Sequence, residues 1–312
     1  MIIAVTGATG FLGQHLVCAL LEHGASVRVL ARREITDMPW SGRVETIRGD
    51  LADGEALARL VAGTTSVVHM AGLVAAQDRP QFLRVNRDGA LMVAQAARHH
   101  APGARFILVS SLAAREPGLS PYAASKQAGE TCVRAAYADT PDQLVIVRPP
   151  AIYGPGDRAT LALFRAANWP LVPLFGDGRS AVIHAADAAE TLARLARGDG
   201  AAGIWALADA NPAGYSLAEL TAEAAKAQGR APRFARLPGT VLLTAGAASG
   251  AWNSLRGQTS VFGLGKAREM LHPDWSVPAA HLPPAPVHAP RITLAEGFRD
   301  TVAWYRARNW LP

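Results

Sequence analysis

A tyrosine and a lysine four positions apart, Tyr122 and Lys126, are the residues of this chain best suited to acid–base chemistry. Four positions make about one helical turn, so a helix that begins near Tyr122 places both side chains on one face. A neighbouring ammonium favours the phenolate form, and we therefore expect the pKa of Tyr122 to be lowered toward neutrality. A tyrosine of this kind can act as general acid or base on a hydroxyl–carbonyl pair.

Two adjacent serines are placed to hold the reacting oxygen of a substrate. The apolar run Phe106–Ser110 predicts a buried strand, and Ser111 follows it directly. Ligands of parallel sheets bind at the carboxyl ends of the strands, where a serine hydroxyl can bond a substrate oxygen. A Tyr-x-x-x-Lys pair alone is common on surfaces, but one that follows such a strand is a strong indication of a site.

The first thirteen residues predict a place for a pyrophosphate group. Ile2–Val5 is typical of a buried parallel strand, and apolar residues recur at helical spacing from Phe11 to Leu21. Between them, Gly7 allows a tight turn, Gly10 lets a ligand approach the backbone, and Gly13 lets helix and strand pack closely. The bare N–H groups and the positive helix end then point to one place. The glycine spacing is three and three rather than the usual two and three, so the turn alone is weak evidence.

These residues need a sheet to position them, and the first half of the chain predicts one. Strand and helix patterns alternate, which favours a parallel, doubly wound α/β sheet of the Rossmann type. The strands are expected at Ile2–Val5, Ser26–Ala31, Val44–Ile47, Ser66–Met70, Phe106–Ser110 and Leu144–Val147, with helices between them at Glu55–Val61, Gln81–His99 and Tyr122–Ala138.

Beyond Arg148-Pro149-Pro150 the alternation becomes irregular, which predicts a smaller second lobe. Ser216–Gln228 and Thr293–Arg308 are expected helices that begin with capping boxes. Pro278–Pro290 is predicted to be an extended surface segment. Additional elements are a strand at Ala181–His184, a helix at Ala186–Ala196 and a strand at Ile204–Leu207, with His184 and Asp187 interpreted as structural.

Residues 237–255 carry no charge at all. Several glycines and a proline make this stretch a poor membrane-spanning helix. The favoured interpretation is a helix packed against the sheet lobe. The alternative is an apolar wall over the substrate or a segment that rests on a membrane surface.

The composition excludes several classes of protein. The chain has 312 residues, of which 50% are hydrophobic, so a large core is expected and global disorder is not. The formal charge of +6 is scattered, which speaks against nucleic-acid binding. Cys18 and Cys132 are far apart and lack ligand spacing; we expect buried free thiols, a reducing compartment and no metal site. The N-terminus lacks a signal-peptide pattern, and a cytoplasmic location is expected.

The order of seven motifs over about residues 1–210 resembles the extended branch of the short-chain dehydrogenase/reductase superfamily. Leu294–Tyr305 is similar to the closing helix of that branch. The motifs are Thr6–Gly13, Gly49-Asp50-Leu51, His69-Met70-Ala71-Gly72, Val85–Gly89, Val109-Ser110-Ser111, Tyr122–Lys126 and Arg148–Gly156.

The resemblance implies a role for each matching residue. Tyr122 would be the catalytic acid/base, and Lys126 would lower its pKa and bind a ribose. Ser111 would hold the substrate oxygen and Asn86 would support the site from the fourth helix. Ser111 is preferred to Ser110 because of its spacing from a position that is usually tyrosine, here Arg115. The implied cofactor contacts are Gly7, Thr9, Gly10, Phe11, Leu12 and Gly13 at the turn, Asp50 and Leu51 beside the adenine, Ala71 and Gly72 beside a ribose, Pro149 beside the nicotinamide, and Ile152.

Arg32 and Arg33 favour NADP(H) over NAD(H). NAD enzymes place an acid at the end of the second strand, whereas this chain has the two arginines there and no acid before Glu34. Two guanidiniums suit a 2′-phosphate, which a carboxylate would repel.

Three functions remain open from the sequence. The first is a reductase or dehydrogenase for an apolar, lipid-like ketone such as a sterol, a long-chain keto lipid or an oxidised ceramide; residues 237–255 and 266–275 resemble the 3β-hydroxysteroid dehydrogenase and dihydroflavonol reductase-like branch. The second is a nucleotide-sugar epimerase or dehydratase, and the third a non-catalytic assembly subunit. The expected lobes are 1–155 with about 181–208 for the cofactor, and 156–180 with 209–312 for the substrate. A homodimer through Gln81–His99 and Tyr122–Ala138 is expected by analogy with the family.

Overall fold

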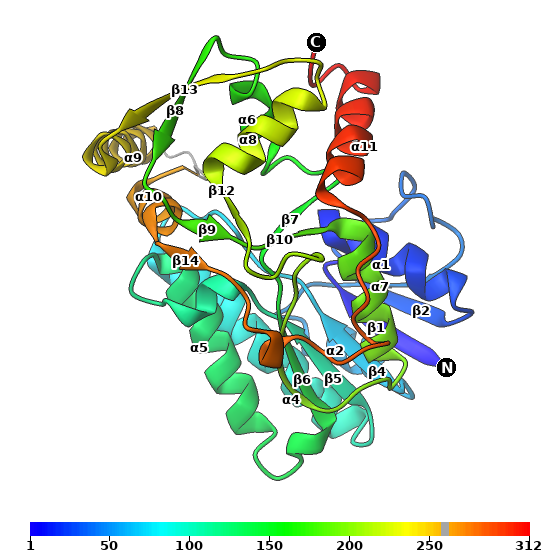
Figure 1. Cartoon of the computed structure of the whole chain (residues 1–312). Coiled ribbons are helices and arrows are strands. Elements are labelled where there is room, and N and C mark those ends of the chain that lie inside the picture. The colour runs from blue at the N-terminus through cyan, green and yellow to red at the C-terminus, as the bar shows by residue number, and fades with distance from the viewer. Residues whose placement is uncertain (257–261) are drawn as a thin grey trace.

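A parallel sheet of seven strands forms the centre of the molecule (Figure 1). The computed structural model describes residues 1–256 and 262–312. The strand order β11-β6-β5-β4-β1-β2-β3 reverses its direction of growth between β1 and β4, which is the point where ligands bind in such sheets. The strands are β1 (Ile2–Thr6), β2 (Ser26–Ala31), β3 (Glu45–Arg48), β4 (Ser66–His69), β5 (Arg105–Val109), β6 (Leu144–Arg148) and β11 (Gly203–Ala206).

Helices cover both faces of this sheet, which confirms the predicted doubly wound fold. On one face, α1 (Phe11–Glu22) packs against α7 (Ala185–Ala196), and Leu16, Leu20 and Leu192 are fully buried there. On the other face lie α2 (Gly54–Val61), α4 (Gly89–His100) and α5 (Pro121–Ala136). The central strands are apolar on both sides because each face is covered. Between β4 and α4, α3 (Arg79–Leu83) leads into a π-helical turn, Arg84–Asp88.

The second part of the chain has its own aromatic core. Phe164, Phe298 and Tyr305 pack edge-on or tilted against one another, with ring centroids 4.9 and 5.4 Å apart. The predicted capping boxes at Ser216 and Thr293 are both present. The helices here are α6 (Leu161–Ala166), α8 (Leu217–Lys226), α9 (Gly239–Leu255), α10 (Leu264–Leu271) and α11 (Leu294–Ala307).

Short strands connect the two parts. β7 (Ala151–Tyr153) pairs with β10 (Val182–His184), β8 (Leu171–Phe175) pairs with β13 (Arg233–Leu237), and β9 (Arg179–Ser180) lies between β12 (Tyr215–Ser216) and β14 (Asp274–Trp275). Short 3₁₀ turns occupy Leu112–Arg115, Pro141–Gln143 and Ala279–His281.

Three sequence expectations need correction. The uncharged stretch is a helix, α9, but it packs on α10 rather than on the sheet. The proline-rich segment is not wholly a surface strand, because Val287 and His288 are buried and His288 bonds the carbonyl of Ala208. Cys18 and Cys132 are free thiols, but both are half-buried rather than buried.

Candidate active site

Tyr122, Lys126 and Ser111 meet at the carboxyl end of β5. The helix α5 begins one residue before Tyr122: Ser120 caps it by accepting the N–H of Ala123 at 3.0 Å, and Pro121 occupies the first turn, where its missing N–H costs nothing. Lys126 follows one turn later and donates to the carbonyl of Val109, the last residue of β5, at 2.9 Å. The phenol of Tyr122 is hydrogen-bonded with the Ser111 hydroxyl.

The predicted lowering of the pKa of Tyr122 is wrong. Burial raises the pKa of its phenol, and the Glu269 carboxylate raises it further, while the bond with Ser111 opposes both. The Lys126 ammonium points to a backbone carbonyl instead, and burial lowers its own pKa to about 8. Tyr122 therefore carries its proton at neutral pH, which suits a proton donor better than a proton acceptor.

The structure separates the roles of the two serines. Ser110 is buried and its hydroxyl donates to Glu130, whose carboxylate also accepts from Arg148 at 2.5 and 2.9 Å. This group ties α5 to the ends of β5 and β6. Ser111 stands at the start of the next turn, where it accepts the N–H of Ala113 at 3.2 Å and reaches Tyr122. The arrangement favours Ser111 over Ser110 as the substrate ligand.

Arg115, which replaces the usual tyrosine, fastens the Ser111 turn to the second part of the chain. Its guanidinium donates to the carbonyls of Asp274 and Ser276, each at 2.7 Å, and lies 5.8 Å from the centre of the Trp275 ring. A second connection joins the Glu269 side chain to the Ser120 hydroxyl. Both elements that carry Ser111 and Tyr122 are therefore held in place by contacts with α10 and β14.

Asn86 is buried beside Gly72. It lies in the π-helical turn before α4 rather than in the regular helix, and such turns are frequent at functional sites. Its amide donates to the Leu73 carbonyl and the Ser125 hydroxyl, both at 2.9 Å, and accepts the Leu73 N–H at 2.7 Å. The segment after β4 is thereby fixed against α5.

The glycine turn fits a dinucleotide on geometric grounds. A Cβ on Gly7 would lie 2.7 Å from the backbone nitrogen of Ala71, and one on Gly13 would lie 2.2 Å from the carbonyl oxygen of Gly7, so no side chain is tolerated at either position. Gly10 caps α1 without a side-chain bond, and the first turn holds no acidic residue. The N–H groups of that turn remain available to a phosphate, with the helix dipole behind them.

The other predicted cofactor residues lie along the same edge of the sheet. Arg32 and Arg33 are exposed just beyond β2, and in the described part of the chain neither has a carboxylate partner. Asp50 and Leu51 follow β3, Ala71 and Gly72 follow β4, and Pro149 follows β6, where its carbonyl accepts the N–H of Leu112. Ile152 lies on β7, and Thr9, Phe11 and Leu12 lie in the turn and on α1.

Three residues that shape the site were not predicted from the sequence. Glu130 follows Lys126 by one helical turn, so its shared face with Tyr122 was a signal that could have been used. Arg148 was quoted only as part of a motif. Glu269 reaches Ser120 from 149 positions away, and no local pattern marks it.

Comparison with known proteins identifies the family. Residues 3–207 match the NAD dependent epimerase/dehydratase family. The whole chain is 51% identical to a ceramide reductase of Caulobacter vibrioides (strain NA1000 / CB15N), of which it covers 96%. It is 29% identical to a dTDP-glucose 4,6-dehydratase of Actinoplanes sp., with 99% of each chain covered. Its fold is similar to the crystal structure of gox2253, with a TM-score of 0.78 at 22% identity over 100% of this chain and 99% of that one.

This chain belongs to the NAD dependent epimerase/dehydratase family, the extended short-chain dehydrogenases/reductases. It is an NAD(P)-dependent oxidoreductase with a Rossmann-type sheet. None of its described helices is long and apolar enough to cross a membrane.

Proposed function

We propose that the protein reduces the ketone of a hydrophobic, lipid-like substrate with NADPH, in the chemical class of sterols, long-chain keto lipids or oxidised ceramides. The observation that carries this proposal is the 51% identity to a ceramide reductase over the full chain. The protonated state of Tyr122 supports the direction, because reduction of a ketone needs a proton donor at the oxygen.

The residues of the site divide the work of the reduction. Bound NADPH supplies the hydride. Ser111 and Tyr122 hold the carbonyl oxygen through their hydroxyls, and Tyr122 gives its phenolic proton to that oxygen as negative charge develops. The Lys126 ammonium, which donates to the Val109 carbonyl, would bind the nicotinamide ribose. Asn86 keeps the backbone after β4 in place, with Lys126 close to Gly72.

We propose NADP(H) rather than NAD(H) as the cofactor because of the charge beyond β2. Arg32 and Arg33 are exposed and unpaired within the described residues, so both are available to a 2′-phosphate. Gly7, Gly10 and Gly13 would hold the pyrophosphate. Residues 1–155 with about 181–208 would form the cofactor lobe, and 156–180 with 209–312 the substrate lobe. We also propose that the protein is a cytoplasmic homodimer whose subunits meet through α4 and α5. A peripheral contact with a membrane is proposed as well.

A nucleotide-sugar epimerase or dehydratase is the second candidate, favoured by the full-length similarity to a dTDP-glucose 4,6-dehydratase. Such an enzyme needs basic residues for a diphosphate. Two of the available arginines are already engaged: Arg179 pairs with Glu219 at 3.3 Å and Arg236 with Asp177 at 2.9 Å. This reduces the support for a diphosphate site. The presence of Ser111, Tyr122 and Lys126 argues against a non-catalytic assembly subunit.

Tyr122→Phe tests the proposed chemistry. The phenyl ring keeps the packing against Phe82, whose ring centroid is 6.1 Å away, but removes the proton donor. Turnover of a keto lipid should fall by about 100-fold or more, while the dissociation constant for NADPH changes little. Tyr137→Phe, at the other end of α5, is the matched control and should keep wild-type turnover. Wild-type turnover in Tyr122→Phe would overturn the assignment.

A further inference from the structure

Basic residues outnumber acidic ones in residues 224–273. Residues 224–273 contain seven lysines and arginines and one acidic residue, a net charge of +6, which equals the net charge of all 312 residues. The rest of the chain is therefore neutral overall. The single acid, Glu269, is buried against Ser120 and pairs with Lys266 at 3.2 Å. Arg236 and Lys226 also have acidic partners, Asp177 and Glu223. The basic residues of this part without an ion-pair partner among the described residues are Arg230, Arg233, Arg256 and Arg268.

The same part of the structure carries most of the exposed large apolar side chains. Eleven such side chains occur among the described residues, and eight of them belong to β8, β13, α9, α10 or the turn before β8. Trp252 is 58% exposed, Val241 44%, Met270 43% and Leu237 39%. A monomer rarely gathers so many on neighbouring elements without a binding role.

These elements lie together at one end of the molecule (Figure 1). α9 packs on α10: a Cβ on Gly246 would lie 3.0 Å from the Cβ of Ala267, and Gly239 faces Leu271. The opposite side of α9 is exposed and uncharged, and it ends in Trp252, on which the Arg256 guanidinium lies 4.3 Å from the ring centre. An exposed tryptophan beside an arginine suits the boundary between water and lipid headgroups.

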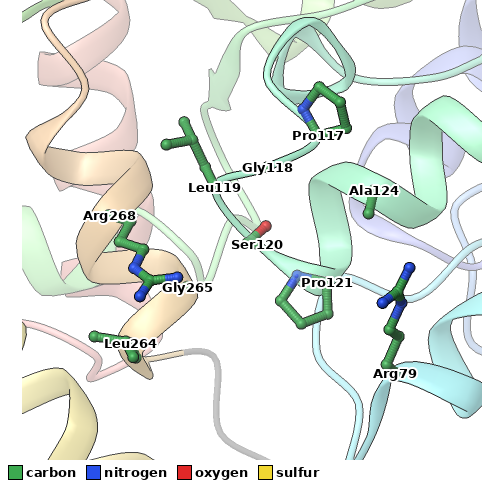
Figure 2. A pocket seen from close by; sticks show the side chains of 10 residues that line it. All are labelled: Arg79, Pro117, Gly118, Leu119, Ser120, Pro121, Ala124, Leu264, Gly265 and Arg268. Atoms are coloured by element: carbon green, nitrogen blue, oxygen red, sulfur yellow. The ribbon is translucent and has the colours of Figure 1, made fainter.

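A groove connects this end of the molecule with the residue before the tyrosine. It has a volume of about 540 Å³ and lies between the starts of α5 and α10 (Figure 2). Leu119, Pro121 and Leu264 give it an apolar lining, and Arg79 and Arg268 stand on opposite sides of Pro121. Ser120 and Pro121, which line the groove, directly precede Tyr122 in the chain, and Tyr122 itself does not line it.

We propose that the surface formed by β8, β13, α9 and α10 docks on an anionic lipid bilayer, so that the groove receives the acyl chain of a substrate from the membrane. This proposal rests on the proposed reduction of a lipid-like ketone. Apolar side chains enter the headgroup region, while the arginines bind lipid phosphates. A second copy of the chain is the weaker choice of partner, because two copies of a surface that carries unpaired arginines repel each other.

Vesicle binding tests the docking surface. The full chain is sedimented with vesicles of phosphatidylcholine, with and without phosphatidylglycerol. Binding should require phosphatidylglycerol and weaken as salt is raised. Arg230→Ala, in the turn before β13, combined with Arg233→Ala should weaken binding by about 25-fold, since each basic residue near an anionic surface contributes about five-fold. Trp252→Ser should also weaken vesicle binding, and the size of this effect should not depend on the salt concentration.

The control replaces two exposed arginines outside the surface, Arg43→Ala with Arg59→Ala, and should bind vesicles like the wild type. Equal binding by the control and the Arg230/Arg233 variant would overturn the proposal, as would failure of the wild type to bind. A shift in oligomeric state caused by Trp252→Ser without a change in vesicle binding would assign the surface to a second copy instead, and would also overturn it.

Turnover of a short-chain, water-soluble ketone without vesicles separates this proposal from the proposed function. If that ketone is reduced but vesicles are not bound, the docking proposal alone fails. If vesicles are bound but no ketone is reduced, the proposed function fails. With a keto lipid embedded in vesicles, the Arg230/Arg233 variant should raise the apparent KM and leave kcat unchanged.

Discussion

Replacing Asn86 by alanine should both destabilise the protein and weaken cofactor binding. The side chain is buried and makes three hydrogen bonds of 2.7–2.9 Å, two with the backbone of Leu73 and one with Ser125. At about 1 kcal/mol net for each bond, the full loss is about 3 kcal/mol. Because Leu73 is only half-buried, water can bond part of its freed backbone N–H and C=O groups. The free energy of unfolding should therefore decrease by about 2 kcal/mol.

Cofactor binding should respond because the freed segment adjoins the dinucleotide site. Asn86 lies against Gly72, where a Cβ would come within 2.9 Å of the amide oxygen. Urea unfolding gives the loss of stability, and fluorescence titration gives the NADPH dissociation constant, which should rise several-fold. Asn253→Ala removes an amide bonded within its own helix and should change neither quantity appreciably. A variant at Asn86 with wild-type stability and affinity would refute this account of its role.

Three further substitutions test other parts of the account. Gly13→Ala should abolish NADPH binding and lower Tm, because the added Cβ would collide with the Gly7 carbonyl. Gly54→Ala is the control, since a Cβ there meets nothing within 4 Å, and it should change neither Tm nor the NADPH titration. Arg32→Ala should weaken NADPH far more than NADH in the same titration, and equal weakening would mean that Arg32 does not bind the phosphate. Burial lowers the pKa of His69 to about 3, well below its ordinary 6.5. As the pH falls, the unfolded chain therefore takes up a proton on this histidine before the folded chain does. The free energy of unfolding consequently decreases as the pH drops from about 6.5 toward 3. Through this histidine the free energy of unfolding of the wild type should decrease by about 2 kcal/mol by pH 5. In urea unfolding, the free energy of unfolding of His69→Asn should depend less on pH by a corresponding amount.

Local sequence patterns were sufficient to predict the elements that position the site. The strands β1 to β6 and the capping boxes at Ser216 and Thr293 depend on neighbouring residues, and each was predicted within a residue or two. The order of motifs also placed Ser111, Tyr122 and Lys126 at one end of β5. Periodicity reports which face of an element is buried, and that is enough to find a sheet edge.

The features that were not predicted correctly from the sequence depend on contacts between distant parts of the chain. The pKa of Tyr122 follows burial and Glu269, and neither can be read from its spacing to Lys126. The pairing of β8 with β13 joins residues about 60 positions apart and has no local signal. Likewise, Val287 is buried because it packs into the sheet core, although its proline-rich surroundings are typical of a surface segment.

The central claim is tested most directly by NADPH absorbance with purified protein and two sets of substrates, long-chain or steroid ketones and UDP-, GDP- and dTDP-sugars. We predict stoichiometric loss of NADPH with a lipid ketone and a rate at least about 100-fold lower with the Tyr122→Phe variant. No loss with any lipid ketone, together with conversion of a nucleotide sugar, would contradict it and identify an epimerase or dehydratase.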